Sequence, residues 1–382
     1  MECEREGYYG LSHNTVTYSP FFCRSALLFY QITPAKWRSY TLLIFSYLFF
    51  WSFSEKLIIY LIGTTFLTHH ICIWMDTMDK RDKRKKRVLQ LGIFLLLGTI
   101  LCLKYRNFFF GNVSKLAMVL HIDWSYRDQL IFLPIGISFY TLSAIGYMTD
   151  VYWGKVKAEY SLVKTALFLG FFPIIVEGPI CRWEDVESTL FKNESVKAAN
   201  VFKGSYRIIW GLFKKMIIAD RLAVLVDKVY VGYESYSGAV IVAAAISYTI
   251  QLYMEFSGCM DMVIGSAGLF GIHLPENFSQ PFFAKTCTDF WKRWHITLGV
   301  WFKNYIFYPV SISNDGHESG INLRENISKG ILENIWREWE LQQWHFSRYG
   351  ISNGLWHGPK MELYFYGLYY FGLNFYGTCI GT

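Results

Sequence analysis

The chain of 382 residues is 53% hydrophobic, 19% aromatic and only 18% charged, whereas soluble domains carry about a quarter charged residues. This balance argues against a soluble protein and favours one embedded in a lipid bilayer. The formal net charge of +7 is spread over short loops between apolar runs, as in loops that flank membrane helices. It does not form the clustered basic footprint of a nucleic-acid-binding protein, and we expect no nucleic-acid partner.

Apolar runs recur along the whole chain and predict its helices. A spanning helix needs about 20 apolar residues, and some runs reach that length while others, such as 40–53, do not. The short runs predict half-spanning, tilted or interfacial helices. The prolines at positions 134, 173, 179 and 275 predict broken helices, which normally line a cavity at membrane depth. We predict an all-α, polytopic membrane protein with about 8–11 membrane helices in a single domain, residues 1–382. The runs cover residues 40–53, 57–75, 88–103, 130–149, 162–180, 206–226, 238–256, 258–274 and 361–376.

The densest basic cluster, residues 80–87, contains seven Lys or Arg residues and one Asp. The positive-inside rule predicts that this loop is cytoplasmic. Lys36 and Arg38, two crossings earlier, then fall on the same side. A clamp for anionic lipid headgroups is an alternative role for the cluster, and it agrees with the same orientation.

Residues 291–309 combine aromatic and basic side chains at helical spacing. Its aromatic and apolar residues step by three or four positions and predict one continuous amphipathic or re-entrant helix. His295 lies at the edge of that aromatic face, where a titratable ring is costly unless it is used or partnered. A structural histidine bonded to a neighbouring carbonyl is the other interpretation. The residues of the predicted face are Trp291, Trp294, Leu298, Trp301, Tyr305 and Tyr308.

A second histidine, His357, lies in the sequence Asn353-Gly-Leu-Trp-His-Gly358 just before Pro359. Proline favours the first helical position, so we expect a helix to begin near Pro359. The positive end of a helix disfavours an imidazolium, so His357 would stay neutral and able to accept a proton. A buried histidine in a tight glycine-rich turn is the alternative.

Other polar residues give weaker signals. No serine elbow, phosphate-binding loop or dinucleotide fingerprint is present, and the eight cysteines show no ligand spacing, so we expect no metal site and no disulfide framework. The pair His69-His70 is interpreted as structural. Acidic residues in apolar context are candidates for lining a polar passage. They are Asp150, Glu177, Asp220, Glu255 and Asp261.

Several motifs, in order along the chain, resemble the membrane-bound O-acyltransferases (MBOAT family), in particular the bacterial branch of alginate O-acetyltransferases and teichoic-acid D-alanyl transfer proteins. The resemblance covers residues 34–310 and 350–376, whereas residues 1–33 and 311–350 match poorly. The motifs are Leu133–Tyr140 (LPIGISFY), Glu177–Ile180 (EGPI), Trp210–Lys215 (WGLFKK), Phe256–Gly258 with Asp261, Leu274–Phe278 (LPENF), Phe290–Leu298 (FWKRWHITL) and Gly354–Gly358 (GLWHG).

The resemblance implies an MBOAT-like helical bundle that transfers an acyl group, with acetyl the expected group, from a thioester to a hydroxyl of a cell-surface polysaccharide. No cofactor is expected to stay bound, and the donor is acetyl-CoA or a carrier-protein thioester. His357 is the implied base and His295 a second essential residue. The implied substrate or tunnel residues are Trp294, Lys292, Arg293, Asn353, Trp356, Asp261 and Glu255. The implied location is a bacterial plasma membrane, with extracytoplasmic acyltransferase proteins as partners.

The sequence departs from the family pattern in its C-terminal third. Residues 336–345 are polar where the family has an apolar helix, and the chain ends within 25 residues of His357. Three alternatives to this function stay open. They are D-alanyl transfer from a carrier protein toward teichoic acid, a truncated non-catalytic membrane scaffold or channel with the same fold, and a transporter, which the lack of an inverted repeat disfavours.

Overall fold

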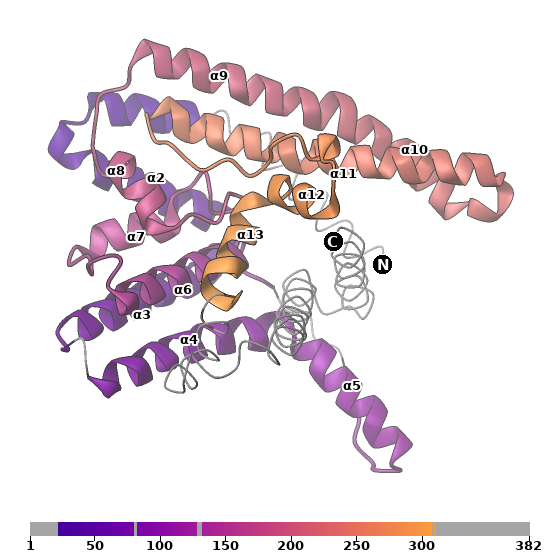
Figure 1. The fold of residues 1–382 in the computed structure, drawn as a ribbon, viewed down its shortest axis with the longest axis horizontal. Coiled ribbons are helices and arrows are strands. Elements are labelled where there is room, and N and C mark those ends of the chain that lie inside the picture. The colour runs from indigo at the N-terminus through magenta and orange to yellow at the C-terminus, as the bar shows by residue number, and fades with distance from the viewer. Residues whose placement is uncertain (1–21, 80–81, 128–131, 308, 310–382) are drawn as a thin grey trace, which may run out of the picture. The chain divides into compact units, whose positions relative to one another are not determined.

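The computed structural model describes residues 22–79, 82–127, 132–307 and 309. Within these residues every regular element is a helix (Figure 1), which confirms the predicted all-α class. The described residues belong to two compact units. One unit takes residues 1–89 and 134–276, and the other takes residues 90–133 and 277–382.

The first unit starts with a helix over residues 22–32 and contains most of the long helices. Its short 3₁₀ segments are η1 (Ala35–Trp37), η2 (Glu55–Leu57) and η4 (Tyr233–Ser235), and its π-helical segment is η3 (Phe213–Ala219). Its α-helices are α2 (Arg38–Ser54), α3 (Ile58–Asp76), the start of α4 (Lys83–Lys104), α6 (Ile137–Trp153), α7 (Leu162–Gly170), α8 (Trp183–Leu190), α9 (Ala198–Leu212), α10 (Asp220–Val231) and α11 (Gly238–Leu269).

Helix α6 forms the core of the first unit. Every residue from Tyr140 to Val151 is buried, and a helix buried on all faces needs neighbours around it. Helix α6 packs on α3 and α7, and α7 also packs on α2. The apolar run predicted at 130–149 therefore corresponds to a central helix of this unit.

The motif glycines at positions 136 and 178 close two turns beside this core. Gly136 has φ +67°, and a Cβ at Gly136 would lie 1.6 Å from the carbonyl oxygen of Ile175, so only glycine fits there. A Cβ at Gly178 would lie 2.3 Å from the Cα of Ile174. The segments around Pro134, Pro173 and Pro179 are non-helical, which confirms the predicted interruptions.

Three stretches of the described residues are long and apolar enough to cross a membrane: Ala35–Asp76, Lys83–Lys104 and Gly238–Leu269. The runs at 238–256 and 258–274 were expected to be separate, and this expectation is wrong for the boundary between them. They form the single helix α11 of 32 residues, about 48 Å long at a rise of 1.5 Å per residue. Helix α7, with nine residues, is too short to span a bilayer.

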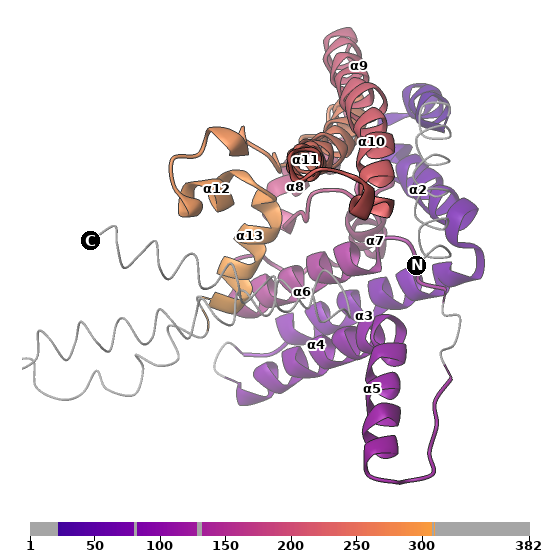
Figure 2. The ribbon, with the colours of Figure 1, turned by 90° about the vertical axis from the view of Figure 1, so that its right-hand side faces the viewer.

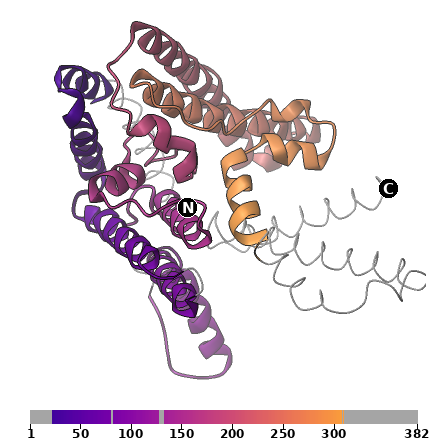
Figure 3. The same cartoon turned by 60° about the vertical axis from the view of Figure 1, so that its left-hand side comes forward.

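Helix α9 and its continuation lie along α11. Figures 1 and 3 show α9 and α11 side by side, and contacts join α11 to α9, η3 and α10. The predicted run at 206–226 thus passes through α9, the π-helical segment η3 and α10. Because π-helical turns are rare and cluster at functional sites, η3 marks this pair of helices for closer inspection.

The second unit contains α5 (Arg106–Val119), η5 (Pro281–Phe283), α12 (Cys287–Arg293), α13 (Ile296–Phe302) and the π-helical segment η6 (Lys303–Phe307). Figure 2 shows the segment after α5 turning back along the helix. The hydroxyl of Tyr126 donates to Asn107 Oδ1 at 2.9 Å, and the amide N–H of Tyr126 donates to Ser114 Oγ at 3.1 Å. The ring of Tyr126 also stacks on Phe110.

Candidate active site

The segment that carries His295 is broken into two helices. The single helix predicted from Trp291 to Pro309 is wrong, because α12 ends at Arg293 and α13 begins at Ile296. Trp294 is extended, with φ −106° and ψ 128°. His295 is left-handed, with φ 47° and ψ 51°, a conformation that costs a non-glycine residue about 1–2 kcal/mol.

A loop from elsewhere in the chain explains the break. The N–H of Ile296 donates to the carbonyl of Asn277 at 3.0 Å, and the N–H of Ser279 donates to the carbonyl of Arg293 at 2.9 Å. The backbone of residues 277–279 therefore satisfies polar groups that a continuous helix would have paired internally. These long-range bonds outweigh the local preference for one helix.

His295 is buried beside Asn277 and Thr297. The exposed fraction is 5% for His295, 6% for Thr297 and 0% for Asn277. The side-chain oxygen Oδ1 of Asn277 lies 3.3 Å from Nδ1 of His295. The same oxygen accepts from the backbone N–H of Thr297 at 3.1 Å and from the hydroxyl of Thr297 at 3.0 Å. One amide oxygen thus contacts both the ring and the first turn of α13.

Aromatic rings surround the neighbouring Trp294. Its ring stacks on Phe290 with centroids 5.6 Å apart and meets Phe278 edge-on at 5.1 Å. Phe282 lies 6.5 Å away. Edge and stacked contacts of this kind add to the burial of the rings. Trp294 is therefore a fixed, apolar neighbour of His295 in the chain.

The basic residues Lys292 and Arg293 end α12, where cations stabilise the helix dipole. Arg293 Nε donates to Asp289 Oδ1 at 2.8 Å, one turn earlier, and this hydrogen bond lowers the pKa of the Asp289 carboxyl. The start of α12 is capped by Thr286, whose hydroxyl accepts from the N–H of Asp289 at 3.1 Å. Lys292 is exposed and is thus the cation of this helix that solvent or a ligand can reach.

Asp261 and Glu255, the two acidic candidates on α11, are both held by cations on α9 and η3. Asp261 accepts from Arg207 Nε at 3.0 Å and from Lys214 Nζ at 2.6 Å. Glu255 accepts from Lys215 Nζ at 2.9 Å. We call this ion-paired contact between α9–η3 and α11 the α9–α11 seam. Two further carboxylates complete the pairs: Glu276 binds Arg207 and Asp220 binds Lys215.

Glycines let the two sides of the seam approach closely. A Cβ at Gly211 would lie 2.5 Å from the carbonyl oxygen of Gly258, and one at Gly204 would lie 2.7 Å from that of Gly265. The glycines are seven residues apart on each helix, so each pair lies on one face after two turns. The close contact brings Lys214 and Lys215 within reach of the carboxylates of α11.

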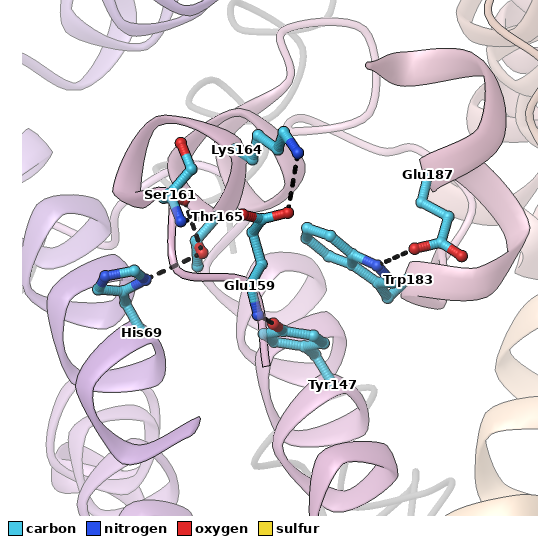
Figure 4. Close-up of polar contacts among 8 residues, drawn as sticks. All are labelled: His69, Tyr147, Glu159, Ser161, Lys164, Thr165, Trp183 and Glu187. Carbon is cyan, nitrogen blue, oxygen red and sulfur yellow. Dashed lines mark hydrogen bonds and ion pairs between the residues drawn. The ribbon is translucent and has the colours of Figure 1, made fainter. Parts of the chain in front are cut away.

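Each of the tandem histidines, His69 and His70, makes a hydrogen bond through its ring. Figure 4 shows His69 bonded to Thr165, with 3.2 Å between Nδ1 and Oγ1. In the same cluster Lys164 donates to the carboxylate of Glu159, and the N–H of Glu159 donates to the hydroxyl of Tyr147. Trp183 stacks on Tyr147 and donates from Nε1 to Glu187. His70 lies exposed, with Nδ1 2.8 Å from the carbonyl of Phe66.

The predicted site residues divide into three groups. Lys292, Arg293, Trp294 and His295 lie together at the α12–α13 break of the second unit, and Glu255 and Asp261 lie on the α9–α11 seam of the first unit. Asn353, Trp356 and His357 lie outside the described residues. Within the described ranges, no group of three or more His, Cys, Asp or Glu residues can hold a metal ion.

The structure adds residues that the sequence did not nominate: Asn277, Thr297, Arg207, Lys214 and Lys215. Four of them belong to motifs already recognised in the sequence: Asn277 to Leu274–Phe278, Thr297 to Phe290–Leu298, and the two lysines to Trp210–Lys215. A polar residue inside an otherwise apolar motif was the available signal. The sequence did not reveal the partner of each one.

Comparison with known proteins agrees with the sequence resemblance. Residues 155–321 match the family model described as MBOAT, membrane-bound O-acyltransferase family. The chain is 30% identical over 327 residues to the probable alginate O-acetylase AlgI of Azotobacter vinelandii, covering 86% of this chain and 64% of the relative. It is 29% identical over 346 residues to the peptidoglycan O-acetyltransferase of Helicobacter pylori, covering 82% and 62%.

A further relative is the teichoic acid D-alanyltransferase of Bacillus subtilis, 26% identical over 251 residues, which cover 62% of this chain and 56% of the relative. The chain spans 62–66% of the length of the alginate O-acetylases it matches. These matches confirm the resemblance inferred from the motifs. The chain is thus similar to membrane-bound O-acyltransferases over residues 155–321, and its long apolar helices are those of a membrane protein.

Proposed function

We propose that the chain is a membrane O-acyltransferase that moves an acyl group from a thioester to a hydroxyl of a cell-surface polysaccharide. The observation that carries the proposal is the buried His295, held by Asn277 at a helix break inside the segment that matches the MBOAT family. A buried, neutral-partnered imidazole is suited to proton transfer. The names of the relatives, two O-acetyltransferases and a D-alanyltransferase, support the same reaction type.

In the proposed reaction, His357 takes the proton from the acceptor hydroxyl as the oxygen attacks the thioester carbonyl. The new C–O bond forms, the C–S bond breaks, and the proton passes from His357 to the leaving thiolate. A thioester is already activated, so the protein mainly deprotonates and aligns the alcohol. His295 orients the acceptor or relays the proton. Asn353 and Trp356, which precede His357 in sequence, are proposed to contact substrate beside it.

The acyl donor is the finer part of the proposal. We propose acetyl-CoA, or an acyl-carrier thioester, as a substrate that approaches past Lys292, Arg293 and Trp294. Arg293 is engaged by Asp289, whereas Lys292 is exposed and suited to an anionic donor. On the α9–α11 seam, the carboxylates of Asp261 and Glu255 are proposed to contact substrate. The surrounding cations hold these carboxylates in place.

The setting proposed for this reaction is a bacterial plasma membrane with residues 80–87 in the cytoplasm, where a thioester donor is made. The acceptor lies on the other side, and extracytoplasmic acyltransferase proteins are proposed to complete the transfer to the polysaccharide. D-alanyl transfer from a carrier protein toward teichoic acid is the second candidate. The 26% identity to a teichoic acid D-alanyltransferase favours keeping it.

Transfer assays on the purified chain separate these candidates. The chain is reconstituted in lipid nanodiscs and incubated with radiolabelled acetyl-CoA or with a D-alanyl-charged carrier protein, each with a polysaccharide or teichoic-acid acceptor. We expect label to pass from acetyl-CoA to polysaccharide hydroxyls. Transfer only from the D-alanyl-charged carrier would mean that the transferred group is D-alanyl and not acetyl. A correctly folded chain that turns over neither thioester would leave only the non-catalytic scaffold or channel.

A further inference from the structure

The contacts of Asn277 determine which nitrogen of His295 carries the proton. Its oxygen Oδ1 accepts from the backbone N–H of Thr297 at 3.1 Å, and a backbone N–H can only donate. The atom facing His295 is therefore the amide oxygen and not the amide nitrogen, which settles the orientation of a group whose O and N are otherwise hard to distinguish. Nδ1 of His295 lies 3.3 Å from that oxygen.

An acceptor oxygen beside Nδ1 requires that Nδ1 carry a hydrogen. A neutral imidazole has one N–H donor and one acceptor nitrogen, so fixing the proton on Nδ1 leaves the lone pair on Nε2. The partner of one ring nitrogen sets the role of the other. In this arrangement Nε2 is the basic atom of the ring, and it keeps that identity as long as Asn277 stays in place.

We propose that Asn277 is a positioning residue that holds His295 in its Nδ1–H tautomer, so that Nε2 is the nitrogen available to the acceptor hydroxyl in acyl transfer. This inference rests on the proposed function. Asn277 is suited to the task because it is fully buried and fixed twice. Its side chain binds Thr297, and its carbonyl accepts from the N–H of Ile296, directly after the histidine.

The neutral amide of Asn277 has a chemical consequence that a carboxylate would not have. A carboxylate at the same position would stabilise the charged imidazolium, whereas an amide oxygen orients the ring without adding a charge. The ring can then accept a proton and release it again within one cycle. Asn277→Asp keeps an acceptor oxygen beside Nδ1, so we expect the hydrogen to stay on Nδ1 while the ring releases its other proton less readily. Asn277→Leu is expected to lose the preference for Nδ1.

The direct test is ¹⁵N NMR of histidine-labelled protein in nanodiscs, since protonated and unprotonated imidazole nitrogens have well-separated shifts. The His295 signals are assigned by their loss in His295→Asn. We expect a hydrogen on Nδ1 of His295 in the wild type, in Asn277→Asp and in the control His70→Asn, whose ring is exposed on α3. Asn277→Leu should shift the ring to Nε2–H or to a mixture. A wild-type ring protonated on Nε2 would overturn the inference without any variant.

Kinetics supply the second readout. We expect Asn277→Leu to lower kcat about 10–100-fold, as loss of a residue that orients a functional histidine does, while KM stays close to that of the wild type. Asn277→Asp should recover part of kcat, and the exposed control His70→Asn should keep all of it. An unchanged kcat in folded Asn277→Leu would contradict the positioning role. A wild type without any acyl transfer, but with the expected tautomer, would instead contradict the proposed function alone.

Discussion

The α12–α13 break and the α9–α11 seam differ in how they partner polar side chains within an apolar protein. At the break, a helix is interrupted and one titratable ring, His295, is held by neutral hydrogen-bonding groups. At the seam, α11 stays continuous and its carboxylates are paired with cations from α9 and η3. The break keeps a buried histidine ring beside uncharged partners, whereas the seam pairs each of these carboxylates with a cation.

This difference predicts separate consequences for the two regions. Disturbing a neutral, partnered ring should remove chemistry and leave folding largely intact. Removing one ion of a buried pair leaves the other charge uncompensated, which is strongly destabilising. Substitutions at the break therefore test the effect on activity, and substitutions at the seam test the effect on stability.

The largest expected effect is on turnover at the break. His295→Asn retains a side-chain amide that can donate to Asn277, and asparagine tolerates the left-handed backbone, but the amide cannot exchange a proton at neutral pH. We expect the rate of acyl transfer to fall by about 10²–10⁴-fold, with a melting temperature near that of the wild type. Initial rates with labelled thioester measure this.

The matched control is His70→Asn, because His70 is exposed and its ring bonds to the carbonyl of Phe66, one turn earlier in the same helix. We expect full activity in this variant. Equal activity of His295→Asn and His70→Asn would show that the histidine at the break is structural, as the alternative sequence interpretation holds.

The next effect is on stability at the seam. Asp261→Ala leaves Lys214, whose side chain is only 14% exposed, without its partner at 2.6 Å, while Arg207 keeps Glu276. We expect a loss of about 3 kcal/mol in the free energy of unfolding. Unfolding in detergent, followed by tryptophan fluorescence, measures it. Glu194→Ala, which breaks exposed pairs with Lys192 and Lys197, should leave the unfolding midpoint unchanged.

A smaller effect is expected from closing the glycine contact. The Cβ of Gly211→Ala would lie 2.5 Å from the backbone oxygen of Gly258, so α9 and α11 must move apart. Overpacking of this kind costs about 1–3 kcal/mol. Gly63→Ala in α3 is the matched control, because nothing lies within 4 Å of its added Cβ, and alanine favours a helix. Equal unfolding midpoints for both variants would mean that the seam does not need its close approach.

The smallest effect concerns how the contribution of Asp289 in α12 to thermal stability depends on pH. The hydrogen bond from Arg293 lowers the pKa of Asp289, so Asp289 stabilises the folded state above its unfolded pKa of about 3.9. That contribution is lost as the pH falls through the lower folded-state pKa. Asp289→Asn should therefore melt below the wild type at pH 7, and the difference should shrink below about pH 4. A difference that persists unchanged at low pH would contradict the assigned ion pair.

The sequence predicted the helical class and the helix breaks near the prolines because these depend on local composition. Apolar runs, prolines at 134, 173 and 179, and glycines at turns are all visible in the chain itself. The helix break within residues 291–309 was not visible in the sequence, because the aromatic pattern continues through Trp294 without interruption. The break arises from backbone bonds to residues 277–279, which lie more than ten positions away in sequence.

The α9–α11 seam likewise depends on long-range contacts that the sequence did not reveal. The sequence showed separate apolar runs at 238–256 and 258–274, with Glu255 and Asp261 near the boundary between them. Their cationic partners, Arg207, Lys214 and Lys215, lie some 40 to 54 positions earlier and allow α11 to continue. Long-range pairing cannot be derived from one sequence, although the residue types that need partners can.

The central claim is that this membrane protein transfers an acyl group with His357 as the base. The most direct measurement is a single-turnover assay in nanodiscs, with labelled acetyl-CoA and a polysaccharide acceptor, comparing the wild type with His357→Gln at matched amounts of folded protein. We expect a burst of labelled ester in the wild type and a rate lower by at least about 10²-fold in His357→Gln. Equal rates for the two proteins would contradict the claim.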